Sequence, residues 1–206
     1  FNISTGKAKK VLYTLIEKIL SYFTDKIILI SEAEYTDAIQ RKICNPKKLV
    51  QINNGVDLEL YKSDTDNNFK KSIGIPEDVK VVGMCCRLTK QKQPVNFVKI
   101  AKKVTSNYEK CVFLLVGDGE LMDSVKEQIK IEKLEDKFIT VGWQKETSKY
   151  INVFDVGVLT SGWEGFGLSL VEYMASGKPV VASAVDGIPY VVRNNKDGVL
   201  VNPENL

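Results

Sequence analysis

Residues 163–183 read WEGFGLSLVEYMASGKPVVAS and combine a glycine-rich turn, a helical pattern and an apolar strand. Gly165 and Gly167 let the backbone approach a bound group without a side chain in the way. The helix that follows directs its free amide groups and the positive end of its dipole into the turn, which suits a phosphate. Glu172 lies eight residues after Glu164, and after about two helical turns we expect it to face the same crevice. The stretch therefore predicts a ligand site with two carboxylates.

Apolar runs of strand length alternate with helical patterns along the rest of the chain. The predicted strands cover residues 26–31, 49–52, 79–86, 111–116, 138–141, 156–160, 180–183 and 199–201. Ser31 and Glu34 form a capping box that predicts a helix to about residue 43. Continuous apolar strands between helices favour a parallel sheet that is covered on both faces. The sequence thus predicts an α/β fold, a Rossmann-like doubly wound parallel sheet.

Four candidate residues come just after the ends of predicted strands. They are Arg87, Gly117, Gly142 and Glu164. Because the carboxyl ends of parallel strands meet at one edge of the sheet, we expect these residues to share a rim, where doubly wound folds bind their ligands.

The spacing Glu-x7-Glu, with Gly-Phe-Gly behind the first glutamate and Ala-Ser-Gly-Lys-Pro-Val-Val behind the second, resembles the donor-site motif of the family 4 retaining glycosyltransferases (glycosyl transferases group 1), which have the GT-B fold. Other family-like segments follow in family order. They are residues 52–57 (INNGVD, with Asn53 in place of proline), 85–88 (CCRL), Lys92, 116–120 (VGDGE) and 141–142 (VG), with Cys86 and Gln93 where glycine is usual. The resemblance covers about residues 25–203.

This resemblance implies two domains, of which the chain holds one and a part. Residues 1–63 correspond to a C-terminal remnant of the acceptor-binding domain, because one helix and two strands are too few for a Rossmann-like half. Residues 64–78 are the expected linker. Residues 79–206 form the expected nucleotide-sugar (donor) domain, truncated at its C-terminus. We therefore expect the chain to be a fragment of a longer enzyme.

The resemblance also implies a reaction, in which a sugar moves from a nucleotide-diphosphate sugar to a glycan or lipid-linked acceptor. Glu164 would accept a hydrogen bond from a hydroxyl of the donor sugar, and Glu172 would accept from the ribose hydroxyls. Arg87 and Lys92 would stabilise the departing diphosphate, so neither a metal nor a cofactor is expected. Backbone groups at seven positions would complete the donor site, namely Gly165, Phe166, Gly167, Leu168, Gly117, Val141 and Gly142.

Other interpretations of the same residues remain open. Arg87 and Lys92 are alternatively surface cations, Glu164 a carboxylate that only complements a helix dipole, and Phe166 a packing residue. A nucleotide-dependent dehydrogenase is the alternative enzyme, although residues 117–120 (GDGE) lack the third glycine of a dinucleotide fingerprint. A third possible function is that of a module that binds a nucleotide sugar without transferring it.

Composition narrows the choice among classes of protein function. The chain has 206 residues, 44% hydrophobic and 27% charged, with a formal charge of +3, so it indicates no nucleic-acid partner. It has no histidine, which excludes a histidine general base within these residues. Four cysteines without metal-ligand spacing indicate reduced packing residues and a cytoplasmic location. The amphipathic helix at 9–23 favours core packing over peripheral contact with the inner face of a membrane.

Overall fold

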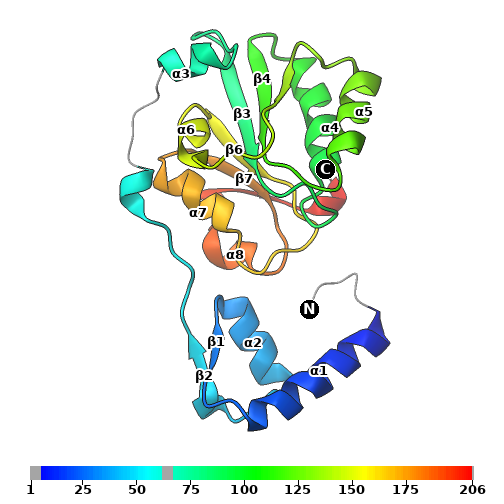
Figure 1. Ribbon diagram of the computed structural model, residues 1–206, viewed down its shortest axis with the longest axis vertical. Coiled ribbons are helices and arrows are strands. Elements are labelled where there is room, and N and C mark those ends of the chain that lie inside the picture. Colours follow the sequence, from blue (N-terminus) through cyan, green and yellow to red (C-terminus); the bar gives the residue numbers. More distant parts are fainter. Residues whose placement is uncertain (1–5, 62–66, 206) are drawn as a thin grey trace.

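The computed structural model describes residues 6–61 and 67–205. Figure 1 shows a small N-terminal part and a larger α/β unit, joined by a single crossing of the chain. The small part contains α1 (Lys7–Tyr22), β1 (Ile27–Leu29), α2 (Glu32–Gln40) and β2 (Leu49–Gln51), with β1 and β2 paired in parallel. A short 3-10 turn, η2 (Leu58–Leu60), leads out of it toward the larger unit.

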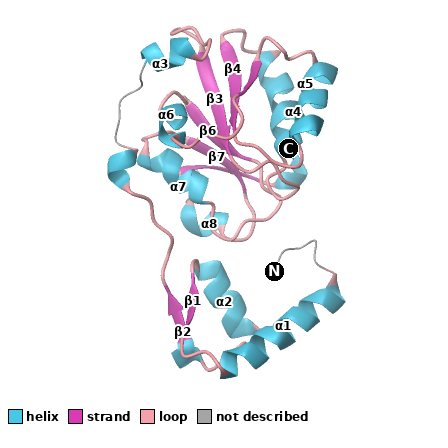
Figure 2. Cartoon of the chain, viewed as in Figure 1, coloured by secondary structure: helices cyan, strands magenta, loops and turns pink. Residues whose placement is uncertain are grey.

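The larger unit is built on a parallel six-stranded sheet with the order β5-β4-β3-β6-β7-β8. Its strands are β3 (Lys80–Cys85), β4 (Cys111–Val116), β5 (Phe138–Thr140), β6 (Val156–Leu159), β7 (Val180–Ser183) and β8 (Gly198–Val201). Its helices are α3 (Asn67–Ser72), α4 (Pro94–Thr105), α5 (Met122–Glu132), α6 (Thr147–Ile151), α7 (Leu168–Ala175) and α8 (Ile188–Val191). Figure 2 shows α4 and α5 on one side of the strands and α6 and α7 on the other, which confirms the predicted doubly wound fold.

The core of this unit explains why its strands are continuously apolar. All six residues of β4 are buried, because helices cover both of its faces. On one face Phe97 of α4 packs against Phe113 of β4, with ring centroids 5.1 Å apart, and against Phe138 of β5, at 5.6 Å. Val56 and Tyr61, which precede the expected linker in the sequence, also pack with this cluster.

The strand order changes direction between β3 and β6, and the two strands separate there. They pair only at Val82–Val156 and Gly83–Gly157. Beyond this point the backbone of Cys85 is hydrogen bonded by α7 instead of by a strand. The Cys85 amide donates to the phenol oxygen of Tyr173 at 2.6 Å, and the Cys85 carbonyl accepts from Tyr173 at 3.3 Å and from the Ser169 hydroxyl at 2.9 Å. Helix α7 is thereby fixed to the central strand.

The predicted capping box and the helix that it begins are both present in the N-terminal part, but the helix is shorter than predicted. The Ser31 hydroxyl accepts from the Glu34 amide at 3.3 Å, and the Glu34 carboxylate accepts in return from the Ile30 amide at 3.0 Å. Helix α2 ends at Gln40 and not near residue 43, because Lys42 adopts a left-handed conformation with φ of 52°. Residues 62–66, which include the start of the expected linker, lie outside the described residues.

The preference for core packing of the apolar face of α1 is wrong for the residues that the structure describes. Six residues of α1 and Phe23, which follows it, are 41–86% exposed; the six are Val11, Leu12, Leu15, Ile16, Ile19 and Leu20. The small cluster of Ala38, Ile43 and Leu49 forms between α2, β1 and β2 without them. Polar contacts attach α1, such as the Lys48 ammonium donating to the Ser21 carbonyl at 2.8 Å.

Within residues 6–61 and 67–205, no helix combines the length and the apolar character that crossing a membrane requires.

The contact between Tyr173 and Cys85 leads to a stability prediction. Tyr173→Phe keeps the buried ring but removes the partner of the Cys85 amide, so we expect the free energy of unfolding to fall by about 1–3 kcal/mol. Urea unfolding measures this change, with Tyr108→Phe, a tyrosine that is 68% exposed, as the control. An unchanged urea midpoint for Tyr173→Phe would contradict the role given to this phenol.

Candidate functional site

Two loops at the carboxyl ends of β3 and β6 are fastened together at the point where the strand order reverses. The Gly162 amide donates to the Gln91 carbonyl at 2.8 Å, and the Gln91 side chain donates to the Trp163 carbonyl at 3.0 Å. The Thr160 hydroxyl, which is buried, donates to the Lys92 carbonyl at 2.9 Å. These bonds bring the residues after β3 and β6 into one site, as the parallel sheet predicts.

Glu164 is held on both its side chain and its backbone. Its Oε2 atom pairs with the Lys92 ammonium and accepts from the Ser161 hydroxyl at 3.1 Å. Its amide donates to the Asp186 carboxylate at 3.1 Å, and its carbonyl accepts from the Gly187 amide at 2.9 Å. The side chain is almost buried, at 11% exposure. Its Oε1 atom is not hydrogen bonded by any described residue and is therefore available to a ligand.

A cavity of about 350 Å³ lies beside Glu164. Its lining comes from α2 of the small part, through Glu34 and Asp37, from the loops that carry Trp163 and Asp186, and from Tyr190 on α8. The wall near Gly165 is made of backbone packed on backbone, because a Cβ atom on Gly187 would lie 2.0 Å from the Gly165 carbonyl oxygen. Four carboxylates, those of Glu34, Asp37, Glu164 and Asp186, line this cavity, as suits hydroxyl groups.

A second cavity, of about 300 Å³, lies on the side of α7 that faces β3 and β4. Arg87, Gly117, Trp143 and Glu172 line it. No described residue hydrogen bonds to or pairs with the exposed Arg87 guanidinium, so this cation is free to bind an anion. The Trp143 indole is 71% exposed at the rim.

Gly117 shapes the floor of this second cavity. It has φ of +134°, and a Cβ atom there would lie 1.9 Å from the Cys86 carbonyl oxygen. Its amide donates to the Gly142 carbonyl at 2.8 Å, which joins the loops after β4 and β5. Only glycine fits this conformation and this close approach.

Glu172 projects from α7 into an environment that disfavours its charge. Burial raises the pKa of the Glu172 carboxyl, and a hydrogen bond from the Tyr61 phenol opposes that rise. Burial likewise raises the pKa of Cys85 and of Cys86 to about 12 each. These two thiols are free, not disulfide bonded, and remain neutral, in agreement with their prediction as packing residues.

The expectation that Glu164 and Glu172 face the same crevice is wrong. Glu164 lines the cavity next to α2, whereas Glu172 lines the cavity that contains Arg87. The reason is that Gly167 has φ of +87° and turns the chain between the two glutamates, so helical spacing applies to only part of the distance between them.

Other predicted residues do not line either cavity. Lys92 contacts Glu164, so the cation expected at the diphosphate neutralises a carboxylate in this structure. Val141 packs against the core, and its carbonyl accepts from the Gln144 side chain at 2.7 Å. Phe166 is half-buried, and Leu168, at the start of α7, is 42% exposed. Neither Phe166 nor Leu168 is among the described residues that line the two cavities.

Four residues of the site escape prediction from the sequence: Tyr61, Trp143, Ser161 and Asp186. Trp143 follows Gly142 at a strand end, and Asp186 precedes a glycine in a turn, so both carry a weak local signal. Tyr61 carries none, because it reaches Glu172 across the fold. Among residues 6–61 and 67–205, no group of three or more Cys, Asp or Glu side chains is placed to hold a metal ion.

Comparisons with known proteins agree with this arrangement. The family described as "Glycosyl transferases group 1" matches residues 65–206. An Escherichia coli relative, UDP-Gal:alpha-D-GlcNAc-diphosphoundecaprenol alpha-1,3-galactosyltransferase, is 30% identical over 100% of this chain and 54% of its own length. N-acetyl-alpha-D-glucosaminyl L-malate synthase from Bacillus anthracis is 28% identical over 83% of this chain and 47% of its own.

A solved structure extends the comparison to three dimensions. Anabaena HepE, crystallised in complex with UDP and glucose, superimposes with a TM-score of 0.80 at 28% identity, over 92% of this chain and 52% of that one. The chain thus spans about half the length of the relatives it matches. Because the family match covers well over half of its residues, the chain belongs to the glycosyl transferases group 1 family.

Proposed function

We propose that this chain is the donor-binding half of a retaining glycosyltransferase of family 4, which moves a sugar from a nucleotide-diphosphate sugar to a glycan or lipid-linked acceptor. One observation carries the proposal: a free cation, Arg87, and a half-buried carboxylate, Glu172, line one cavity where the strand order reverses. That is where doubly wound folds bind nucleotides. The named relatives support it, since one uses UDP-Gal by name and another was crystallised with UDP and glucose.

The cavity with Arg87 suits the nucleotide. Glu172 would accept hydrogen bonds from the two ribose hydroxyls, because an ionised carboxylate only accepts. Arg87 would bind the diphosphate as a two-pronged donor. Trp143, at the rim, would stack on the base, a contact worth about 1–3 kcal/mol for an aromatic side chain. Gly117 lines this cavity, and the backbone at Val141 and Gly142 would complete the site.

The cavity with Glu164 suits the sugar. The Oε1 atom of Glu164 would accept a hydrogen bond from a sugar hydroxyl, while Lys92 and Ser161 hold the Oε2 atom of the same carboxylate. The Lys92 ammonium has three donors, so it can keep Glu164 and turn another N–H toward the diphosphate. When the bond from the anomeric carbon to the diphosphate oxygen breaks, the nucleotide leaves with its negative charge stabilised by Arg87 and Lys92. The backbone of residues 165–168 would contact the diphosphate.

The acceptor would approach from the small part of the chain, since α2 contributes Glu34 and Asp37 to the wall of the sugar cavity. A lipid-linked acceptor would bring the enzyme to the cytoplasmic face of the membrane. The exposed apolar face of α1, beside Lys9 and Lys10, supports a peripheral contact there.

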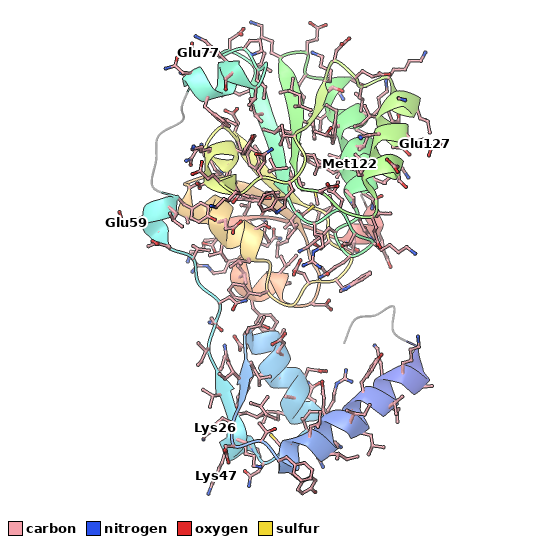
Figure 3. The ribbon with its side chains drawn as sticks, viewed as in Figure 1. Lys26, Lys47, Glu59, Glu77, Met122 and Glu127 are labelled. Atoms are coloured by element: carbon pink, nitrogen blue, oxygen red, sulfur yellow. The ribbon has the colours of Figure 1, made fainter. Side chains whose placement is uncertain are left out.

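Nucleotide binding tests the proposal directly. We expect calorimetric titration of the purified chain with UDP-, GDP- and ADP-sugars to reveal binding of one nucleotide class. Glu172→Ala should weaken that binding by about 1.5–3 kcal/mol, because hydrogen bonds to a charged group are lost. Glu127→Ala, at an exposed glutamate of α5 (Figure 3), is the matched control. Equal affinity in the Glu172→Ala variant and the unaltered protein would contradict the ribose contact.

The same carboxylate should reduce the stability of the ligand-free protein at neutral pH. Burial raises the pKa of Glu172 above its unfolded value, so the folded state binds more protons and loses stability as pH rises from about 4.5 through the folded pKa. Glu172→Gln removes this titration. We expect it to unfold at higher denaturant than the unaltered protein at about pH 8, with a difference that shrinks toward about pH 4. Glu127→Gln should show no such trend.

Metal removal provides a further test. Because Arg87, Lys92 and the amides at the start of α7 supply fixed positive charge, we expect donor binding to persist in EDTA. Calorimetry before and after chelation measures this. A loss of affinity in EDTA that magnesium or manganese restores would show that a metal takes part.

A further inference from the structure

A short turn between β7 and α8 carries Asp186, which lines the cavity beside Glu164. Figure 1 shows α8, which follows the turn, at the end of the larger unit that faces the small part. Asp186 has φ of 40°, a left-handed conformation that residues other than glycine rarely adopt. Both ends of the turn are fixed, because Val185 and Ile188 are buried in the main core and the Ile188 amide donates to the Val185 carbonyl at 2.9 Å. The core therefore holds Asp186 in a conformation that is unfavourable for its backbone.

This turn binds the backbone of Glu164 on both sides of its Cα atom. The Glu164 amide donates to the Asp186 Oδ2 atom at 3.1 Å, and the Glu164 carbonyl accepts from the Gly187 amide at 2.9 Å. The Gly187 backbone also packs directly on the next residue, since a Cβ atom on Gly187 would lie 2.0 Å from the Gly165 carbonyl oxygen. The turn after β7 thus fixes the two peptide groups that flank Glu164.

The loop around Glu164 depends on such outside contacts, because it is rich in glycine. Three glycines fall between residues 162 and 167: Gly162, Gly165 and Gly167. Glycine has more conformational freedom to lose than any other residue, so a loop of this kind orders only where neighbours restrain it. Lys92 and Ser161 contact the end of the Glu164 side chain. The direction of the carboxylate also depends on where its backbone lies, and Asp186 contributes to fixing that.

Few residue types meet both requirements at position 186. The left-handed conformation is tolerated by glycine, asparagine and aspartate. The bond from the Glu164 amide needs a side-chain acceptor, which glycine lacks. Aspartate meets both requirements, and its charge strengthens the bond to a backbone amide. Because glycine meets only the first requirement and asparagine meets both, substitution can separate the conformation of the turn from the hydrogen bond.

We propose that Asp186 is a positioning residue of the donor-sugar site, which acts through the Glu164 amide to fix the direction of the Glu164 carboxylate. The proposal rests on the proposed function, because it gives Glu164 the contact with a sugar hydroxyl. Asp186 lines the cavity beside Glu164 and does not line the cavity that contains Arg87. Its effect should therefore fall on the sugar and leave the nucleotide unaffected.

The first test uses the ligand-free chain and needs no nucleotide. Asp186→Gly retains the left-handed conformation without the carboxylate, whereas Asp186→Asn retains an oxygen that can accept from the Glu164 amide. NMR measures hydrogen exchange of the Glu164 amide. We expect this amide to exchange about tenfold faster in Asp186→Gly than in the unaltered protein, and Asp186→Asn to keep most of the protection. Equal exchange in Asp186→Gly and the unaltered protein would overturn the proposal, whether or not the chain binds nucleotides.

Asn195→Gly is the matched control for this substitution. Asn195 also has a left-handed conformation, with φ of 59°, and lines neither cavity. Its replacement likewise removes a polar side chain and introduces a glycine at a position that already suits one. Effects of the glycine alone should thus appear in both variants, and only Asp186→Gly should change exchange at Glu164.

The second test separates the sugar contact from a general loss of structure. Calorimetry gives the affinities for UDP and for UDP-galactose, and their ratio reports the contribution of the sugar. We expect Asp186→Gly to lower the affinity for UDP-galactose about two- to tenfold and to leave the affinity for UDP unchanged. Asp186→Asn should remain close to the unaltered protein. An unchanged ratio in Asp186→Gly would overturn the role of Asp186 in sugar binding.

A double substitution decides whether Asp186 acts through Glu164 or on the sugar itself. In a Glu164→Ala background, Asp186→Gly should cause no further change in the ratio of the two affinities. An equal further loss in that background would show a direct contact with the sugar and would overturn the positioning role. An unaltered chain that binds no UDP, or a ratio that Glu164→Ala leaves unchanged, would count against the proposed function, and hydrogen exchange would still decide whether Asp186 fixes Glu164.

Discussion

The separation of β3 from β6 is the constraint on which the rest of the structure depends. A sheet that is wound in both directions must open where its order reverses, and an opened parallel strand leaves backbone groups without partners. Here those groups belong to Cys85, and α7 supplies their partners through Tyr173 and Ser169. The same helix carries Glu172 one position before Tyr173. The bonds that close the opening therefore also fix the carboxylate that borders it.

The two glutamates occupy contrasting surroundings, and this contrast divides the site into two parts. Glu164 pairs with the Lys92 ammonium and accepts a hydrogen bond from the Ser161 hydroxyl, so its charge is compensated before any ligand binds. Glu172 meets neutral groups and one phenol, and its charge is compensated only in part. Hydroxyl groups of a ligand should therefore stabilise the charge of Glu172 more than that of Glu164, because the protein itself stabilises the charge of Glu172 only in part.

Much of this architecture follows from the sequence, because it rests on local signals. Apolar runs locate the strands, the Ser31–Glu34 capping box locates α2, and the position of Arg87 at a strand end places it on the ligand rim. Gly177 follows the end of α7 in a left-handed conformation, with φ of +67°. Long-range contacts leave no such local signal in the sequence. Helical spacing could not reveal that Gly167 turns Glu164 away from Glu172, or that Tyr61 reaches α7.

The hydrogen bond between Tyr173 and Cys85 joins positions 88 residues apart in the sequence, which has a consequence for folding. Strands β3, β4 and β5 pair with sequence neighbours, whereas β6 must return across them to the other side of β3. Closing long loops is entropically costly, and contacts of this kind form late. During synthesis the edge of β3 thus remains open until α7 emerges, and an open strand edge can pair with another chain. The edge that borders the proposed nucleotide site therefore stays open until the chain has been synthesised as far as Tyr173.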